Sequence, residues 1–169
     1  RIHEKADRGT AVHGFTEPGA PAGDAIPESL RAAVASFWEG NRKEAIEMLG
    51  TEIFTANDTT MSAGTFDHAV RVHGHPLLED IVIADKKTGR FDPFSWCVQI
   101  SSYAHGEPYN LEDDTRPGWP GDVNLDYGLV WHIDVPKGST TLYMIDLQLG
   151  WRRAQIAAEV RDAHKRTDI

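Results

Sequence analysis

The sequence HGHPLLE, residues 73–79, contains the end of a strand-forming run that begins at Phe66 and ends at His75. Residues two apart in a strand point to the same face, so His73 and His75 are predicted to face a common point. Glu79 follows four residues later and is placed to fold back toward the two imidazoles. Two imidazoles and one carboxylate form the smallest ligand set of a non-haem ferrous site, so these three residues are a candidate metal site.

A second stretch, at a predicted turn, lacks the histidine that would complete such a site. Residues 136–141 read PKGSTT, and Thr141 stands where a partner strand is expected to supply one more imidazole. Threonine is a poor ligand beside imidazole, so we predict that the chain binds no metal of its own. A working site of His73, His75 and Glu79 is the alternative. The simplest interpretation is that the two histidines are hydrogen-bonded or solvated at a strand end and that the glutamate is a surface carboxylate.

Composition and charge narrow the class of protein. The chain has 169 residues, of which 40% are hydrophobic and 25% are charged, as expected for one globular domain with a packed core. Its net charge of -9 opposes binding to a phosphate backbone, so nucleic acid is not an expected partner. No apolar run approaches the length of a membrane span, so no membrane partner is expected. The single cysteine, Cys97, suits a reducing compartment, and we expect a cytoplasmic protein.

Periodicity divides the chain into an arm and one domain. Residues 1–26 are rich in glycine, proline and alanine, which predicts an extended arm that is ordered only on another surface. The domain, residues 27–169, is predicted to open with a helical hairpin over residues 27–50. The first helix of this hairpin has apolar residues at helical spacing: Leu30, Ala33, Val34, Phe37 and Trp38. Gly40 is predicted to end it, and Asn41 to cap the second helix.

The following region, residues 51–149, alternates with the period of strands and is predicted to be mainly β. Six strands are predicted, at Glu52–Thr55, Phe66–His75, Leu78–Ala84, Phe94–Tyr103, Tyr127–Asp134 and Thr141–Leu149. Two short loops, residues 86–89 and 136–138, are predicted to join consecutive strands as hairpins. Successive hairpins without helices between them predict an antiparallel barrel or sandwich. A long irregular segment, residues 104–123, interrupts the strands, and a helix over residues 151–166 is predicted to end the domain.

The two histidine-linked stretches resemble the paired motifs of the cupin superfamily. The first cupin motif has two histidines flanking one residue and then a glutamate, which His73, His75 and Glu79 match. The second motif has proline, any residue, glycine, two residues and then histidine. Residues 136–138 match its beginning, and Thr141 replaces its histidine. The resemblance implies a cupin-like antiparallel barrel with an incomplete metal motif.

Four phrases carry a more specific resemblance. They are GTAVHG at residues 9–14, FWEG at 37–40, HPLLED at 75–80 and DYGLVWHID at 126–134. Together with the chain length, they resemble the small subunit of two-subunit hydroquinone 1,2-dioxygenases. Such enzymes use Fe(II) and dioxygen to open the ring of hydroquinone, which gives 4-hydroxymuconic semialdehyde. The resemblance implies that this chain supports a larger cupin-type catalytic subunit that holds the iron, in a heterotetramer that acts on a small aromatic substrate.

The same resemblance implies that the isolated chain is inactive and that its role is contact with the large subunit. We assign that contact to the arm, to the irregular segment of residues 104–123 and to the last helix. Trp119 and Trp151 are the predicted interface anchors, because tryptophan is enriched at the energetic centres of interfaces. The alternative for each tryptophan is that it covers the core of its own domain. A metal-free cupin that binds a ligand or has a regulatory role is a further interpretation of the motifs.

A fold of a different class also fits the pattern. A helical hairpin followed by a curved antiparallel sheet is typical of the cone-shaped fold (SnoaL/NTF2-like) of small dehydratases and polyketide cyclases. The pocket of that fold is self-contained, and His132 and Asp134 would then serve as an acid–base pair. The cone-shaped fold usually ends on a strand, whereas this chain is predicted to end on a helix.

Overall fold

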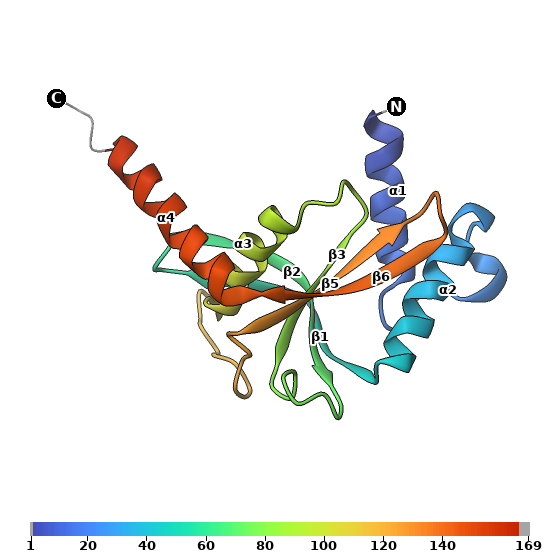
Figure 1. Ribbon diagram of the computed structural model, residues 1–169, viewed down its shortest axis with the longest axis horizontal. Coiled ribbons are helices and arrows are strands. Elements are labelled where there is room, and N and C mark those ends of the chain that lie inside the picture. The colour runs from blue at the N-terminus through green and yellow to red at the C-terminus, as the bar shows by residue number, and fades with distance from the viewer. Residues whose placement is uncertain (1, 166–169) are drawn as a thin grey trace.

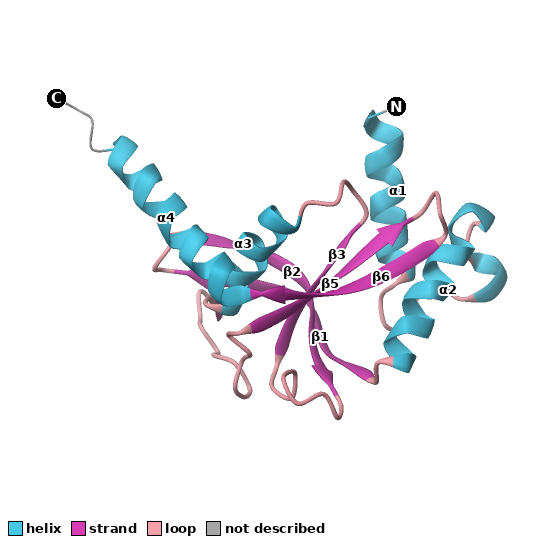
Figure 2. Ribbon diagram, viewed as in Figure 1, coloured by secondary structure: helices cyan, strands magenta, loops and turns pink. Residues whose placement is uncertain are grey.

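The computed structural model describes residues 2–165 as a mixed α/β fold around one six-stranded sheet (Figures 1 and 2). Arg1 belongs to the predicted arm, and residues 166–169 belong to the predicted domain; both lie outside the described residues. Among the described residues, none of the helices combines the length with the apolar character needed to cross a bilayer.

Helices and strands alternate irregularly along the chain. In order, they are α1 (Ile2–Phe15), a short 3-10 helix (Gly23–Ala25), α2 (Glu28–Lys43), β1 (Ile46–Asn57), β2 (Ser62–Val72), β3 (Val82–Lys87), α3 (Pro93–Ala104), β4 (Glu107–Pro108), β5 (Tyr127–Asp134), β6 (Ser139–Asp146) and α4 (Leu147–Lys165). The strand order in the sheet is β4-β1-β2-β3-β5-β6. All neighbours run antiparallel except β3 and β5, which are parallel.

Helices cover both faces of the sheet, so there are two apolar cores. Helices α1 and α2 lie on one face and contribute Val12 and Phe37 to the first core, whereas α3 and α4 lie on the other (Figure 1). Strand β3 lies near the middle of the sheet and contributes to both cores, with Ala84 on the α1 and α2 face and Ile83 on the α3 and α4 face. Because side chains alternate along a strand, the residues that follow Ala84 also point to opposite faces.

Several predicted elements are confirmed. The helix expected from Pro27 is α2, and the strand predicted at Tyr127–Asp134 has the bounds of β5. The predicted hairpin at residues 136–138 joins β5 to β6, where Gly138 has a positive φ of 64°. The terminal helix is also present but begins earlier than predicted, at Leu147. It packs closely on α3, because a Cβ on Gly150 would lie only 2.1 Å from the carbonyl oxygen of Cys97.

The prediction of an extended N-terminal arm is wrong for most of its length. Residues Ile2–Phe15 form α1, and the glycine and proline residues that suggested an arm cluster after this helix. Val12 is fully buried in the first core. Thr16 ends the helix, since its hydroxyl donates to the carbonyl oxygen of Val12 at 2.9 Å. The N-terminal segment is therefore part of the folded unit.

The predicted second helix of the hairpin over residues 27–50 is also wrong. Helix α2 continues through Gly40 to Lys43, and β1 begins at Ile46. Ala45 has a positive φ of 51° and redirects the chain between the two elements. The pairing of β1 with β2 along most of their length outweighs the helical pattern in the sequence of residues 41–50.

The strand predicted at Phe94–Tyr103 is instead helix α3. Asp92 caps the helix by accepting a hydrogen bond from the Ser95 amide at 3.2 Å, and Pro93 occupies the first turn. Residues 86–89 consequently do not form a hairpin but lead into the connection from β3 to the parallel strand β5. The expected antiparallel barrel or sandwich is not confirmed, because within residues 2–165 the edge strands β4 and β6 do not pair and the sheet stays open.

Candidate active site at a fork in the sheet

Strands β2 and β3 separate at two opposed carboxylates. The strands pair over only three positions, the last of which joins His68 to Ala84. The next position in that register sets Asp67 opposite Asp85. There the carboxylates take the place of the backbone hydrogen bonds between the strands. Asp67 Oδ2 accepts from the Lys86 amide at 2.6 Å, and Asp85 Oδ1 accepts from the Asp67 amide at 3.3 Å. We call Asp67, Asp85, Lys86 and Lys87 the strand fork.

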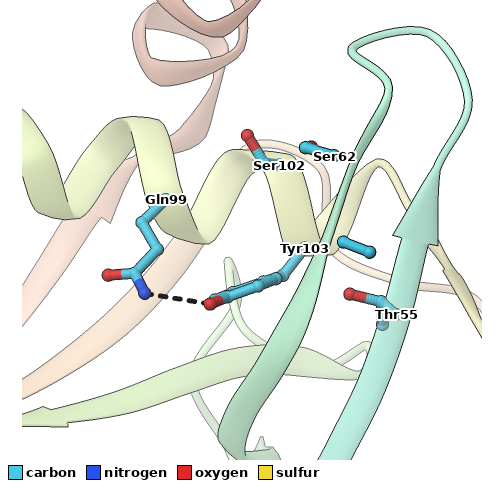
Figure 3. Close-up of a pocket in the computed structure, with 6 residues that line it drawn as sticks. Thr55, Ser62, Gln99, Ser102 and Tyr103 are labelled. Carbon is cyan, nitrogen blue, oxygen red and sulfur yellow. Dashed lines mark hydrogen bonds between the residues drawn. The ribbon is translucent and has the colours of Figure 1, made fainter.

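One lysine of the strand fork lies on the α3 side of the sheet. Lys87 is two residues beyond Asp85, so both side chains point to this face, and the Lys87 ammonium forms an ion pair with the Asp85 carboxylate. Lys87 Nζ also donates to Gln99 Oε1 at 2.7 Å. Gln99 Nε2 in turn donates to the Tyr103 hydroxyl at 2.9 Å, as Figure 3 shows. A continuous polar chain therefore extends from Asp85 into α3.

The other lysine points to the opposite face, where α1 and the residues after it cover the strand fork. The side chain of Lys86 is 0% exposed and forms an ion pair with Glu17. His13 lies at the end of α1, with its Nδ1 3.4 Å from Asp67 Oδ1. His68 Nε2 is 3.8 Å from Glu17 Oε1, and neither ring nitrogen of His68 has a hydrogen-bond partner among the described residues.

Burial and neighbouring charges shift the ionisation of this cluster. Burial raises the pKa of Asp67, but hydrogen bonds from His13 and from the Lys86 amide outweigh it and lower that pKa to about 2. Burial, reinforced by the negative charge of Asp67, raises the pKa of Asp85. Burial and the charge of Lys86 lower the pKa of His68 to about 4, so its ring is neutral at pH 7. Two carboxylates with pKa values pushed apart in this way are typical of functional sites.

A small pocket adjoins the polar chain on α3. It has a volume of about 190 Å³ and lies between β1, β2 and α3 (Figure 3). Its lining consists of Thr55, Ser62, Ala63, Gln99, Ser102 and Tyr103. Burial raises the pKa of Tyr103, so its hydroxyl stays protonated and available as a donor. Four of the six lining side chains carry a hydroxyl group, and the pocket also includes Gln99, which holds Lys87.

The structure does not assemble the metal site predicted at residues 73–79. The side chain of His73 is 58% exposed, and its Nε2 lies 2.8 Å from Glu47 Oε2. His75 Nδ1 accepts from the Leu77 amide at 3.3 Å within the turn between β2 and β3. Over residues 2–165 there is no group of three or more histidine, cysteine, aspartate or glutamate side chains placed to hold an ion, so Glu79 does not complete such a group either. Thr141 pairs with His132 across β5 and β6.

The other predicted site residues each contact a different partner and do not form a common site. His132 Nε2 lies 2.9 Å from the Gly89 carbonyl oxygen, whereas the Asp134 carboxylate pairs with Lys137 at 2.9 Å. The indole of Trp119 donates to the Gly106 carbonyl oxygen at 3.0 Å, and the ring of Trp151 stacks on His105 with centroids 4.1 Å apart. The interface role of the two tryptophans stays a prediction.

Sequence reasoning missed the strand fork because its residues were assigned to a loop and to a strand. A usable signal was present: the apolar run at residues 81–84 continues directly into Asp85, Lys86 and Lys87. Burying a charge costs free energy, so charged side chains that continue a buried strand indicate paired charges or a functional site. Comparison with known proteins supplies no assignment: no family model matches the chain, and no curated protein matches it.

Proposed function

We propose that the strand fork is the active site of a hydrolase that uses a divalent cation to cleave phosphodiester bonds in a nucleic-acid strand. The observation that carries this proposal is the pair of opposed carboxylates of Asp67 and Asp85, with the Lys87 ammonium beside Asp85. Magnesium is usually bound by one or two carboxylates together with water and substrate phosphate. A two-carboxylate site therefore needs no third protein side chain.

The energetic cost of the cluster supports a functional role. Asp67 is 8% and Asp85 5% exposed, and Lys86 is fully buried on the same strand pair. Each buried ion costs several kcal/mol of desolvation, and apolar residues would stabilise the centre of a sheet at least as well. Repulsion between the carboxylates contributes to the raised pKa of Asp85, and a bound cation would relieve that repulsion.

The side chains of the strand fork have distinct roles in this proposal. Asp67 and Asp85 would hold the cation, which when bound supplies Lewis acidity and lowers the pKa of a coordinated water. Lys87, held by Asp85 and Gln99, places a fixed positive charge where negative charge develops on a phosphate oxygen. Gln99 and Tyr103 are positioning residues, since they act on Lys87 and not on the substrate.

Lys87 favours an anionic substrate over a neutral one. Two carboxylates alone would also suit glycoside hydrolysis, in which one acts as an acid and the other as a base or nucleophile. Lys87 instead gives the strand fork a partly exposed cationic side chain on the α3 side, and a lysine ammonium is a common partner of phosphate. The proposal departs from the expectation that nucleic acid is not a partner. That expectation used the net charge of the whole chain, whereas the cation and Lys87 act locally.

The role as a dioxygenase small subunit stays a prediction, as does the cone-fold acid–base pair of His132 and Asp134. Neither involves the strand fork. The dioxygenase role requires iron on a larger partner, whose presence next to this chain can be tested by co-purification. Ring cleavage of hydroquinone by such a complex, unaffected by substitution of Asp85, would favour it over the hydrolase.

The hydrolase is tested with labelled single-stranded and double-stranded oligonucleotides in Mg²⁺ or Mn²⁺. We expect cleavage by the wild-type chain that is abolished by EDTA, by Asp85→Asn and by Lys87→Ala. His73→Ala is the matched control, because His73 is exposed on the turn between β2 and β3 and should leave cleavage unchanged. Absence of cleavage with either ion, or equal cleavage by Asp85→Asn, would refute the proposal.

A further inference from the structure

A larger pocket begins where the strand fork ends. Its volume is about 440 Å³, within the range of small-ligand sites. Three segments form its walls: Gly9 of α1, residues 88–90 after Lys87, and residues at the turn between β5 and β6. A Cβ on Gly9 would lie 2.8 Å from the Thr88 hydroxyl, which is too close for a side chain. Helix α1 therefore packs against Thr88 at a position that favours glycine. The pocket and Lys87 are thus adjacent along one chain segment.

An exposed aromatic ring contacts one of the residues that line this pocket and packs on other aromatic side chains. Phe91 follows the pocket residue Arg90 and is 49% exposed. Its ring centroid lies 5.1 Å from that of Trp96, 5.3 Å from that of Tyr143 and 5.8 Å from that of His132, which itself lines the pocket. Trp96 is buried, so these rings support Phe91 from beneath and leave part of it open to solvent. A supported ring of this kind is suited to stacking with a planar ligand.

The charge of the pocket favours an anionic ligand. Arg90 lines the pocket and forms no salt bridge with any carboxylate that the structure describes. Among the lining residues whose side chains the structure describes, Asp134 is the one carboxylate, and it is paired with Lys137 at 2.9 Å. Hydrogen bonds from Ser95, together with the charge of Arg90, lower the pKa of the exposed Asp92 carboxyl, although Arg90 and Asp92 do not form a salt bridge. Such a guanidinium beside an exposed ring matches the two parts of a nucleotide, a phosphate and a base.

We propose that this pocket is a nucleotide subsite, in which Phe91 stacks on an unpaired base and Arg90 binds a phosphate of the strand whose neighbouring linkage lies at the strand fork. This inference rests on the proposed function, and it specifies the substrate as single-stranded. Bases within a duplex are already stacked on both faces, so only an unpaired base can stack on Phe91 without disrupting a pair.

Binding without turnover tests this subsite separately from the hydrolase. The fluorescence anisotropy of a short labelled oligothymidylate is measured with the full chain in EDTA, which prevents cleavage. Phe91→Ala should weaken binding by about 10-fold, in line with the contribution of one stacked base, and Phe91→Trp should restore it. Arg90→Ala should weaken binding and lower the slope of log affinity against log salt by about one. A duplex of the same length should bind more weakly than the single strand.

Phe94→Ala is the matched control, since Phe94 is a second exposed phenylalanine near the start of α3 whose ring contacts Arg153 instead of the pocket. It should bind as the wild type does. Equal binding by Phe91→Ala and wild type, or equal binding of duplex and single strand, would overturn the subsite even if the chain cleaves nucleic acid. If the chain binds the oligonucleotide through Phe91 but cleaves no substrate, the subsite is supported and the proposed hydrolase activity is refuted. Circular dichroism of each variant confirms that it is folded.

Discussion

Asp67 and Asp85 occupy opposed positions on β2 and β3, and each carboxylate accepts a backbone hydrogen bond from the facing strand. The two carboxylates therefore take over the role of the missing ladder bonds. Backbone groups buried without partners would be costly, and this exchange satisfies them while holding both acids in place. The position of the candidate site thus follows from where the strand pairing stops.

Asp85→Asn should stabilise the chain at pH 7 in the absence of divalent cations while abolishing cleavage. The folded pKa of Asp85 is raised, so its contribution to stability falls as the pH rises from its ordinary value of 3.8 through the folded value. The ionised carboxylate opposes folding, and an asparagine lacks that charge while it keeps the Oδ1 acceptor for the Asp67 amide. Differential scanning fluorimetry should give a higher Tm for the variant in EDTA.

Added Mg²⁺ provides the control for this prediction. It should raise the Tm of the wild type and leave the Tm of Asp85→Asn nearly unchanged, because a bound ion stabilises only the state that binds it. A variant that is less stable than the wild type in EDTA would contradict the assignment of Asp85 as the strained carboxylate.

Asp67, unlike Asp85, should stabilise the folded chain in its ionised form, so its replacement should change the loss of stability in acid. Its folded pKa of about 2 lies below the ordinary aspartate value of 3.8, so its stabilising contribution is present above pH 3.8 and is lost as the pH falls through about 2. This shift corresponds to roughly 2 kcal/mol. Urea unfolding between pH 2 and pH 5 should show a steeper loss of stability in the wild type than in Asp67→Asn. Parallel curves for the two proteins would show that Asp67 is not the responsible group.

The elements that the sequence predicted correctly are those with one clear signal. Helix α2 has a single apolar stripe that includes Phe37, and β5 is an apolar run bounded by turn residues. Helix α3 was missed because Trp96, Val98 and Ile100 favour strands locally. The Asp92 and Pro93 cap was the only local indication of a helix there, and packing of this segment on the sheet outweighs its strand propensity.

The candidate site could not be assembled from sequence for a different reason. Asp67 and Asp85 are far apart in the chain and meet only because β2 and β3 pair in one register. His13 reaches Asp67 only because the N-terminal segment is a docked helix and not an extended arm. The motif at residues 73–79 was more conspicuous, yet its histidines lie in an exposed turn. Local spacing identified possible ligands, whereas strand register determines which carboxylates are neighbours.

Gln99→Ala should slow cleavage without greatly changing substrate affinity. Gln99 holds the Lys87 ammonium at 2.7 Å, and loss of a hydrogen bond to a charged group costs about 1.5–3 kcal/mol, or at least about a tenfold change. Lys87 would keep its charge but lose one of its two restraints, so kcat should fall by about 10-fold while KM stays close to that of the wild type. Steady-state kinetics on a single-stranded oligonucleotide measure both quantities.

Tyr103→Phe is the matched variant for Gln99, because it removes only the hydroxyl that Gln99 contacts. Its effect on kcat should be smaller than that of Gln99→Ala. A larger effect of Tyr103→Phe would mean that the tyrosine hydroxyl acts on the substrate and is not a positioning group.

Glu17→Ala should destabilise the chain strongly, whereas the double variant Glu17→Leu with Lys86→Met should not. The single change leaves the fully buried Lys86 ammonium without its carboxylate, and breaking a buried ion pair from one side costs about 3–5 kcal/mol. Replacing both partners with apolar side chains removes the desolvation cost as well, so the double variant should unfold within about 1 kcal/mol of the wild type or above it. Urea denaturation measures both differences. If the two variants lost the same amount of stability, Lys86 would owe its burial to contacts other than Glu17, such as the His13 carbonyl oxygen 3.5 Å from its Nζ.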